Sequence, residues 1–330
     1  MRTVPLRRLL VALLTVVLVL TATFAALHLA PGDPVRLYLG PAADEAVVAA
    51  TRHAEGLDRS LAVQYADWLA RFVTGDWGTS IPQHRPVTRV LGDALKPTLM
   101  LVGISLLLTY LAGILVGAFQ ASRRRTALDA GLTAVTTFLY ALPSYVVALA
   151  LVLVFAYAAA LWGWPSWLRY PAFGAASVGA EFLPKAARCV DALRHLVLPV
   201  TTLALVGAAG TARFVRGAVL EALRQPFVRA ARAKGLRETR VLVRHAVRNA
   251  LVPVLTLLGL QLPALFSGVV FVEVIFGWPG MGRATVQAVL ARDYPVVMAS
   301  TAVFACLVVA GNLVADVLAA LADPRTEAAA

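Results

Sequence analysis

The sequence predicts an all-α, polytopic membrane protein with about six transmembrane helices. The chain has 330 residues, of which 60% are hydrophobic and only 15% are charged. A soluble domain usually has about 45–50% apolar and about 25% charged residues. The apolar residues also fall in long blocks, so the sequence favours one helical bundle in lipid over one or two soluble domains.

Six long stretches lack Asp, Glu, Lys and Arg, and each predicts a membrane crossing because about 20 apolar residues span about 30 Å of hydrocarbon. They are 9–32, 97–122, 130–168, 195–212, 249–272 and 294–315. The fourth is short but can extend past Arg213. The third is too long for one crossing, so we expect its helix near 132–160. Aromatic residues that favour the membrane interface follow it, at Trp162, Trp164, Trp167 and Tyr170.

The first stretch has two interpretations. Arg2, Arg7 and Arg8 precede an apolar run, as in a secretory signal peptide. The run is longer than the usual 7–15 residues of such a signal. We therefore expect a retained anchor.

The distribution of charge predicts that both termini are cytoplasmic. The net charge is +12. With the N-terminus inside, the inner pieces are strongly basic, whereas the two signs nearly balance in the outer pieces. The inner pieces are 1–8, 123–129, 213–248 and the tail, and the outer ones are 33–96, 169–194 and 273–293. Lys and Arg concentrate on the cytoplasmic side of membrane proteins. Their clustering beside apolar runs also argues against nucleic-acid binding.

These crossings divide the chain into four predicted parts. They are an N-terminal cytoplasmic tip with the first helix (1–30), an extracytoplasmic region (31–97), a five-helix core (98–322) with a cytoplasmic loop at 213–248, and a cytoplasmic tail (323–330). The extracytoplasmic region shows helical periodicity in Leu61, Tyr65, Trp68, Leu69 and Phe72.

The loop at 213–248 contains a second helix signal. Residues 226–237 read PFVRAARAKGLR, with Pro226 suited to a first helical turn and Gly235 suited to a left-handed cap. Small alanines give such a helix a narrow face that fits a groove of another protein, and its arginines can pair with carboxylates. A basic segment on anionic lipid headgroups is the alternative.

Several motifs resemble one known family, the inner-membrane permeases of binding-protein-dependent ABC importers, in the dipeptide/oligopeptide/nickel branch. The resemblance covers the chain from the first helix to Arg325. It is carried by FVRAARAKGL (227–236), RHAVRNALVP (244–253), Glu273 with WPGMG (278–282), RDYP (292–295) and DPR (323–325). Upstream, LRHLVLP (193–199), GLD (56–58) and GDWGTS (75–80) also match.

The resemblance implies an ABC type I importer permease fold in the bacterial plasma (inner) membrane. It implies a second homologous permease subunit, two ATPase subunits and an extracytoplasmic solute-binding protein as partners, besides membrane lipid. ATP and Mg would be bound by the ATPase subunits, and no cofactor by this chain. The ATPase-coupling contact would comprise Phe227, Val228, Arg229, Ala230, Ala231, Arg232, Ala233, Lys234, Gly235 and Leu236. Arg229 replaces the glutamate of the wider family's loop motif, a departure that resembles the peptide branch.

The sequence offers no catalytic chemistry of its own. None of Lys96, Lys185 and Lys234 stands in a Walker A motif, and the five histidines lack metal-ligand spacing. Glu273 and Asp316 are the two acidic residues near membrane depth, where an ionisable group is a functional candidate by default. Hydration at the membrane interface explains the position of either residue about as well as a function does.

One further pattern concerns packing. Gly113 and Gly117 form a small-xxx-small pair that lets two helices approach closely.

Two alternative functions stay open at this point. An ion-coupled secondary transporter or channel would need buried charge relays or rings of charge, and the crossings contain almost none. A membrane assembly factor without a transport role is the other. The sequence leaves the solute open among dipeptides, oligopeptides, nickel chelates, glutathione and other solutes such as some sugars.

Overall fold

The regular elements of the described residues are helices, apart from one isolated bridge between Thr79 and Pro86, which confirms the all-α prediction. A computed structural model describes residues 3–29, 34–40, 43–54 and 56–322. The helices are α1 (Thr3–Leu29), α2 (Pro34–Leu39), α3 (Glu45–Ala54), α4 (Leu61–Thr74), α5 (Val87–Ser122), α6 (Ala127–Ala141), α7 (Ser144–Val152), α8 (Ala159–Leu161), α9 (Lys185–Ala222), α10 (Pro226–Ala233), α11 (Glu238–Arg240), α12 (Arg248–Ile275), α13 (Met281–Leu290) and α14 (Tyr294–Ala322). Short π or 3-10 turns are η1 (Leu153–Ala158), η2 (Ser166–Leu168), η3 (Ala180–Phe182) and η4 (Val241–Val247).

Five helices in the described part of the chain are long and apolar enough to cross a membrane. They are Leu10–Leu29, Val87–Ser122, Ser144–Leu161, Lys185–Ala222 and Tyr294–Ala315, and Ala127–Ala141 is a shorter apolar helix. The fifth predicted crossing, 249–272, falls on α12. In its described part, each of the six predicted stretches therefore contains helix.

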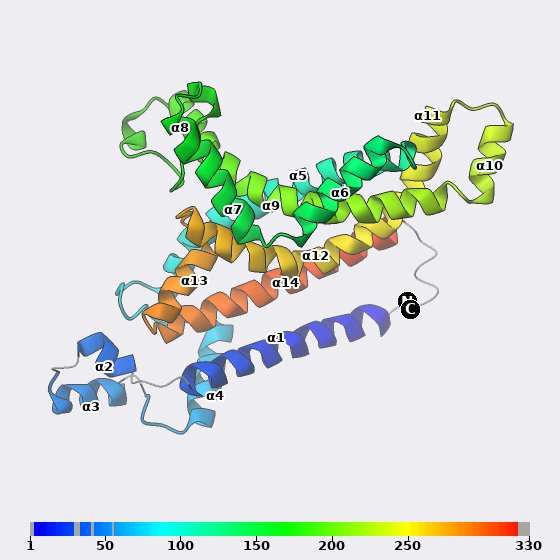
Figure 1. Cartoon of the computed structure of the whole chain (residues 1–330). Coiled ribbons are helices and arrows are strands. Elements are labelled where there is room, and N and C mark those ends of the chain that lie inside the picture. The colour runs from blue at the N-terminus through cyan, green and yellow to red at the C-terminus, as the bar shows by residue number, and fades with distance from the viewer. Residues whose placement is uncertain (1–2, 30–33, 41–42, 55, 323–330) are drawn as a thin grey trace. The chain divides into compact units, whose positions relative to one another are not determined.

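The third crossing is broken in two, which corrects the single helix expected near 132–160. α6 ends at Ala141 and α7 begins at Ser144, while Leu142 is extended with φ −78° and ψ 131°. Leu142 precedes Pro143, whose ring disfavours the α conformation of the preceding residue. Both helices pack along α9 (Figure 1). The two pieces together thus replace the expected single helix.

α9 is much longer than its predicted core, and its first turns hold the segment before it. Arg194 Nη2 donates to the carbonyl oxygens of Ser166 and Arg169, each over 2.6 Å. Ser177 Oγ donates to Asp191 Oδ1, also over 2.6 Å. The start of α9 is therefore tied to the connection that links α8 to it.

α5 approaches α9 closely at glycines, which confirms the packing predicted for Gly113 and Gly117. A Cβ added at Gly113 would lie 2.5 Å from Thr211 Cβ, and one at Gly117 would lie 2.5 Å from the Ala212 carbonyl oxygen. A Cβ added at Gly207 of α9 would in turn lie 2.7 Å from Thr109 Oγ1. In lipid no hydrophobic driving force brings two helices together, so close van der Waals packing at these glycines stabilises the contact.

The chain forms two compact units, residues 1–97 with 280–309 and residues 98–279 with 310–330. The first unit has a core of Val87, Leu91, Ala288, Val296, Val297 and Ala299. The predicted division into anchor, extracytoplasmic region, core and tail stays a prediction. The tail, 323–330, lies outside the described residues.

The periodic segment of the first unit forms α4, as predicted. Gly75 ends this helix with φ +87°, and Asp76 N donates to the Arg71 carbonyl over 3.0 Å. α1 lies against α4, because Thr21 Oγ1 and Tyr65 Oη are hydrogen-bonded at 2.8 Å. The described end of α1 is therefore part of this unit.

Candidate functional site

α10 forms in the connection between α9 and α12, where the sequence predicts a helix (Figure 1). Gln225 is extended and Pro226 opens the first turn, where its missing N–H costs no helical hydrogen bond. Gly235 has φ +72°, a left-handed conformation that glycine adopts without strain. Its N–H donates to the Arg232 carbonyl over 2.9 Å. Local sequence alone thus defines both ends of the helix.

The inner face of α10 is packed against its own chain. Val228 is 0% exposed and Ala231 is 5% exposed. Both contact Val241 of η4 in a small hydrophobic cluster that Leu223 and Leu236 complete. Val228 and Ala231, two of the predicted contact residues, therefore anchor α10 and do not face outward.

The opposite face of α10 is exposed. Its exposed residues, which we name the α10 outer face, are Phe227, Arg229, Ala230, Arg232, Ala233, Lys234 and Gly235. The Phe227 side chain is 40% exposed. Arg229 and Lys234 make no ion pair within the described ranges. An aromatic ring beside cations and small side chains has the composition of a docking surface.

One cation of the α10 outer face is already paired within the loop. Arg232 Nε donates to Glu238 Oε2 over 3.0 Å, and its Nη2 donates to Glu238 Oε1. The hydrogen bonds from Arg232 hold the pKa of Glu238 below its usual range. This pair closes the turn around Gly235, so Arg232 links α10 to α11.

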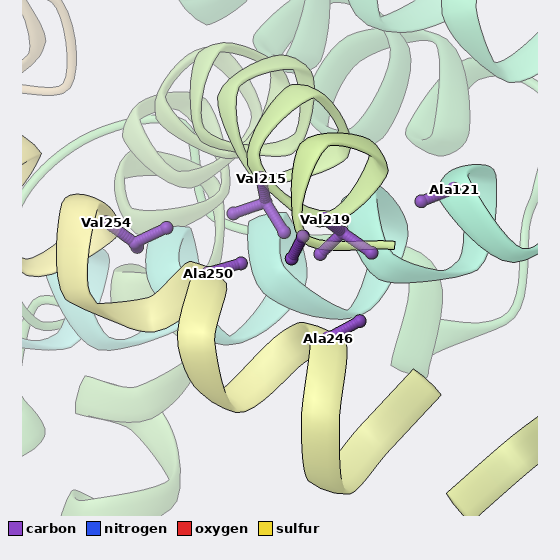
Figure 2. Close-up of a cluster of buried hydrophobic side chains, with 7 residues drawn as sticks. Ala121, Val215, Val219, Ala246, Ala250 and Val254 are labelled. Carbon is purple, nitrogen blue, oxygen red and sulfur yellow. The ribbon is translucent and has the colours of Figure 1, made fainter. Parts of the chain in front are cut away.

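A hydrophobic cluster connects this loop to the membrane helices. It consists of Ala121, Val215, Val219, Ala222, Ala246, Ala250 and Val254, from α5, α9, η4 and α12. Figure 2 shows Val219, Ala246 and Ala250 directed toward one another. Because α10 is anchored on η4, a displacement of α10 would be passed directly to the ends of α9 and α12.

An ion pair between α6 and α9 lies in the same unit, and sequence reasoning missed it. Arg216 donates to Asp129 through Nε and Nη2, at 2.8 Å each. Asp129 also accepts from the Arg125 backbone N–H at 3.1 Å. Asp129 lies directly before the stretch 130–168, and Arg216 lies four residues after the stretch 195–212. Opposite charges near the ends of two predicted crossings are the signal that could have indicated this pair.

Glu273 is the candidate at membrane depth that the structure describes. Its side chain is 0% exposed, and Thr98 Oγ1 donates to Glu273 Oε1 over 2.5 Å. Interfacial hydration therefore does not account for Glu273 in this structure. The side chain of Asp316 lies outside the described ones.

These features define a class: a polytopic helical membrane protein with a short, anchored helix exposed between two crossings. The chain belongs to the family of binding-protein-dependent transport system inner membrane components, whose model matches residues 113–328. The family's N-terminal model matches residues 1–101. The protein is thus a non-catalytic permease subunit of the inner membrane. Membership excludes the secondary transporter, channel and assembly-factor interpretations.

Curated relatives match over nearly the full length. The oligopeptide transport system permease protein AppB of Bacillus subtilis is 39% identical over 306 residues, which cover 92% of this chain and 93% of AppB. The glutathione transport system permease protein GsiC of Salmonella typhimurium is 36% identical, with 97% of each chain covered. The di/tripeptide transport system permease protein DppB of Pseudomonas aeruginosa is 37% identical, with 92% of each covered.

A solved structure supports the fold. It is described as an amino acid ABC transporter with histidines, and it matches with a TM-score of 0.50 and 17% sequence identity. The match covers 72% of this chain and 94% of that chain. At this identity the likeness concerns the fold alone.

Proposed function

We propose that this chain is the transmembrane permease of an ATP-driven importer for peptides or a similar small solute, coupled to its ATPase through residues 226–236. The single observation that supports the coupling role is the two-sided construction of α10. One face is fixed on η4 by Val228 and Ala231. The other exposes Phe227 beside Arg229 and Lys234, which form no ion pair with a described residue. A helix that is anchored on one side and exposed on the other can bind a partner and pass the partner's movement to its own chain.

The proposed assembly contains a second, homologous permease, two ATPase subunits and an extracytoplasmic solute-binding protein. Both termini and the loop 213–248 face the cytoplasm, where the ATPase subunits bind ATP and Mg. The basic inner pieces support this orientation. Membrane lipid surrounds the bundle, and no nucleic acid takes part.

A peptide-like solute is supported by the names of the relatives, which describe oligopeptide, di/tripeptide and glutathione permeases. The close α5–α9 packing is inconsistent with a path between these two helices, since Gly113 and Gly117 leave no room there. The solute would therefore pass along the faces that meet the second permease.

Coupling is tested in proteoliposomes that contain this chain with its cognate ATPases, second permease and binding protein. Phe227→Ala and Arg229→Glu should each lower solute uptake at least about tenfold, because both alter the α10 outer face. ATP hydrolysis should lose its stimulation by the binding protein. Arg124→Glu is the matched control, because Arg124 is an equally exposed arginine of a predicted cytoplasmic connection.

Normal uptake by both α10 variants would contradict the coupling role. Orientation is tested separately by single-cysteine labelling at position 229 from either side of the membrane. The natural Cys189 and Cys306 are exposed and must first be replaced. Labelling of position 229 from the outside would contradict the proposed topology.

A further inference from the structure

The first unit contains a cavity that the coupling mechanism does not use. Its volume is about 550 Å³, which is within the range of pockets that hold small molecules. Its lining comes from the ends of α1 and α3, from the turn before α4, from α4 itself, from the segment 76–84 after it and from the start of α14. All of these segments belong to the unit of residues 1–97 and 280–309. The cavity is therefore formed within one compact unit.

Aromatic rings form much of the cavity wall. Phe24, Trp68, Trp77 and Tyr294 all line it. Trp68 stacks on Phe72 with ring centroids 5.2 Å apart, and Phe72 stacks on Trp77 at 5.1 Å. Such a stack gives a rigid apolar surface for an apolar or aromatic side chain.

Charges of both signs stand at the same cavity without ion-pair partners. Arg71 and Asp76 line it, and neither makes an ion pair with any residue that the structure describes. The two residues are held near each other, because the Asp76 backbone N–H donates to the Arg71 carbonyl over 3.0 Å. The second charged pair of the wall, Arg59 and Asp67, is by contrast neutralised by a 2.9 Å contact. Asp76 Oδ1 accepts from the Gly78 backbone N–H over 3.1 Å, so Arg71 and the other carboxylate oxygen of Asp76 are available to one carboxylate and one ammonium group.

The cavity wall also contains a buried donor without an acceptor. The Trp68 indole Nε1 is buried and finds no hydrogen-bond partner among the described residues. Because this nitrogen has almost no accessible surface, it faces the interior of the wall and not the open cavity, so Trp68 offers a ligand its ring and not its N–H. Trp77 Nε1, in comparison, donates to the Phe72 carbonyl over 3.3 Å.

We propose that this cavity is a binding site for a small zwitterion with an apolar side chain, of the dipeptide class. The carboxylate lies at Arg71, the ammonium group lies at Asp76, and the side chain lies over Trp68 and Trp77. This inference rests on the proposed function, which makes peptides the solute. It adds a site on the permease itself, in the region that we place outside the cell, where a solute would be held before it enters the bundle.

The test uses the full chain in nanodiscs of pure phosphatidylglycerol, which contain no zwitterionic lipid. Isothermal titration with alanyl-phenylalanine should give saturable binding. N-acetyl-alanyl-phenylalanine amide, which has neither terminal charge, should not bind. Arg71→Gln and Asp76→Asn should each weaken binding of the free dipeptide about tenfold, because each removes a charge-assisted contact.

Arg89→Gln is the matched control, since Arg89 is exposed in the same unit and does not line the cavity. It should bind the dipeptide as the unchanged chain does. The comparison of free and blocked dipeptide needs no variant, so misfolding of a variant does not affect it. Equal binding of both peptides, or no saturable binding of either, would overturn the proposal.

A lipid headgroup is the other source of a zwitterion. Phosphoethanolamine serves as a second ligand in the same titration, and its binding in the absence of dipeptide binding would also overturn the proposal. Uptake by the complete transporter separates this inference from the proposed function. Dipeptide uptake that is unaffected by Arg71→Gln and Asp76→Asn would contradict the proposed binding site but not the proposed function as a peptide permease. Absence of peptide uptake by the unchanged transporter would contradict the proposed function.

Discussion

Asp129 and Arg216 join α6 to α9 through two parallel hydrogen bonds of 2.8 Å. Asp129 is 4% exposed, whereas Arg216 is partly exposed. The planar guanidinium group matches a carboxylate in this two-point geometry, which fixes direction as well as distance. The first half of the broken third crossing is thereby held to the long helix that leads to α10.

Loss of one partner of this pair should destabilise the bundle. Asp129→Asn or Arg216→Ala should each lower the free energy of unfolding by about 1–3 kcal/mol, because the other group is left without its partner in a largely buried place. The double variant should cost less than the sum of the two. Reversible unfolding in mixed micelles measures this coupling. Additive effects would show that the pair contributes nothing.

A side chain at Gly113 or Gly117 should separate α5 from α9. The added Cβ would lie 2.5 Å from Thr211 Cβ or from the Ala212 carbonyl oxygen, so we expect each Gly→Ala change to cost about 1–3 kcal/mol. Gly103→Ala is the matched control in the same helix, because nothing lies within 4 Å of its added Cβ. That control should be neutral or stabilising by up to about 1 kcal/mol. Thermal unfolding in detergent distinguishes the two classes.

The turn after α10 should be sensitive to substitution at Gly235. Proline cannot adopt the φ of +72° that the turn needs, so Gly235→Pro should displace α10. Arg232→Glu should have a similar effect, since it replaces the pair with Glu238 by a repulsion. We expect both variants to reach the membrane, and the ATPase subunits assembled with them to hydrolyse ATP without solute uptake. Undiminished uptake in both would argue against the coupling role of α10. Gly217→Ala is the control, because a Cβ added at Gly217 meets nothing within 4 Å.

The pair between Arg232 and Glu238 also predicts a pH dependence. The hydrogen bonds from Arg232 lower the pKa of Glu238 in the folded chain. A lowered carboxyl pKa contributes stability that is present above the unfolded-state pKa, near 4.5, and is lost as the pH falls through the folded-state pKa. The hydrogen-exchange protection factors of the 232–238 turn, which are corrected for the intrinsic pH dependence of amide exchange, should therefore change little from neutral pH down to about 5 and fall only below that. Glu238→Gln should show the lower protection already at neutral pH.

Local sequence signals predicted the parts of the fold that depend on neighbouring residues. α4 follows from the periodicity of Leu61 to Phe72, and α10 follows from Pro226 and Gly235. The close α5–α9 contact follows from the spacing of Gly113 and Gly117. In each instance the sequence signal lies within a few turns of one helix, although only the structure shows that α9 is the helix that α5 contacts.

Features that depend on distant contacts were not predicted. Asp129 and Arg216 are far apart in sequence, and only the packing of α6 on α9 brings them together. The inward direction of Val228 depends likewise on Val241, which lies beyond the Gly235 turn. The break at Leu142 was missed for another reason, because Pro143 was read as part of a continuous apolar run although the residue before a proline disfavours helix.

The uninterrupted course of α9 has a mechanical consequence. At 1.5 Å per residue its 38 residues measure about 57 Å, almost twice the roughly 30 Å thickness of the hydrocarbon layer. This one helix, which contains Pro199, thus carries the loop held by Arg194 near one end and the cluster around Val219 at the other. A nanobody that clamps residues 166–177 should therefore restrain the far end of the same helix. It should slow ATP hydrolysis by the assembled transporter without touching the surface that we propose is cytoplasmic.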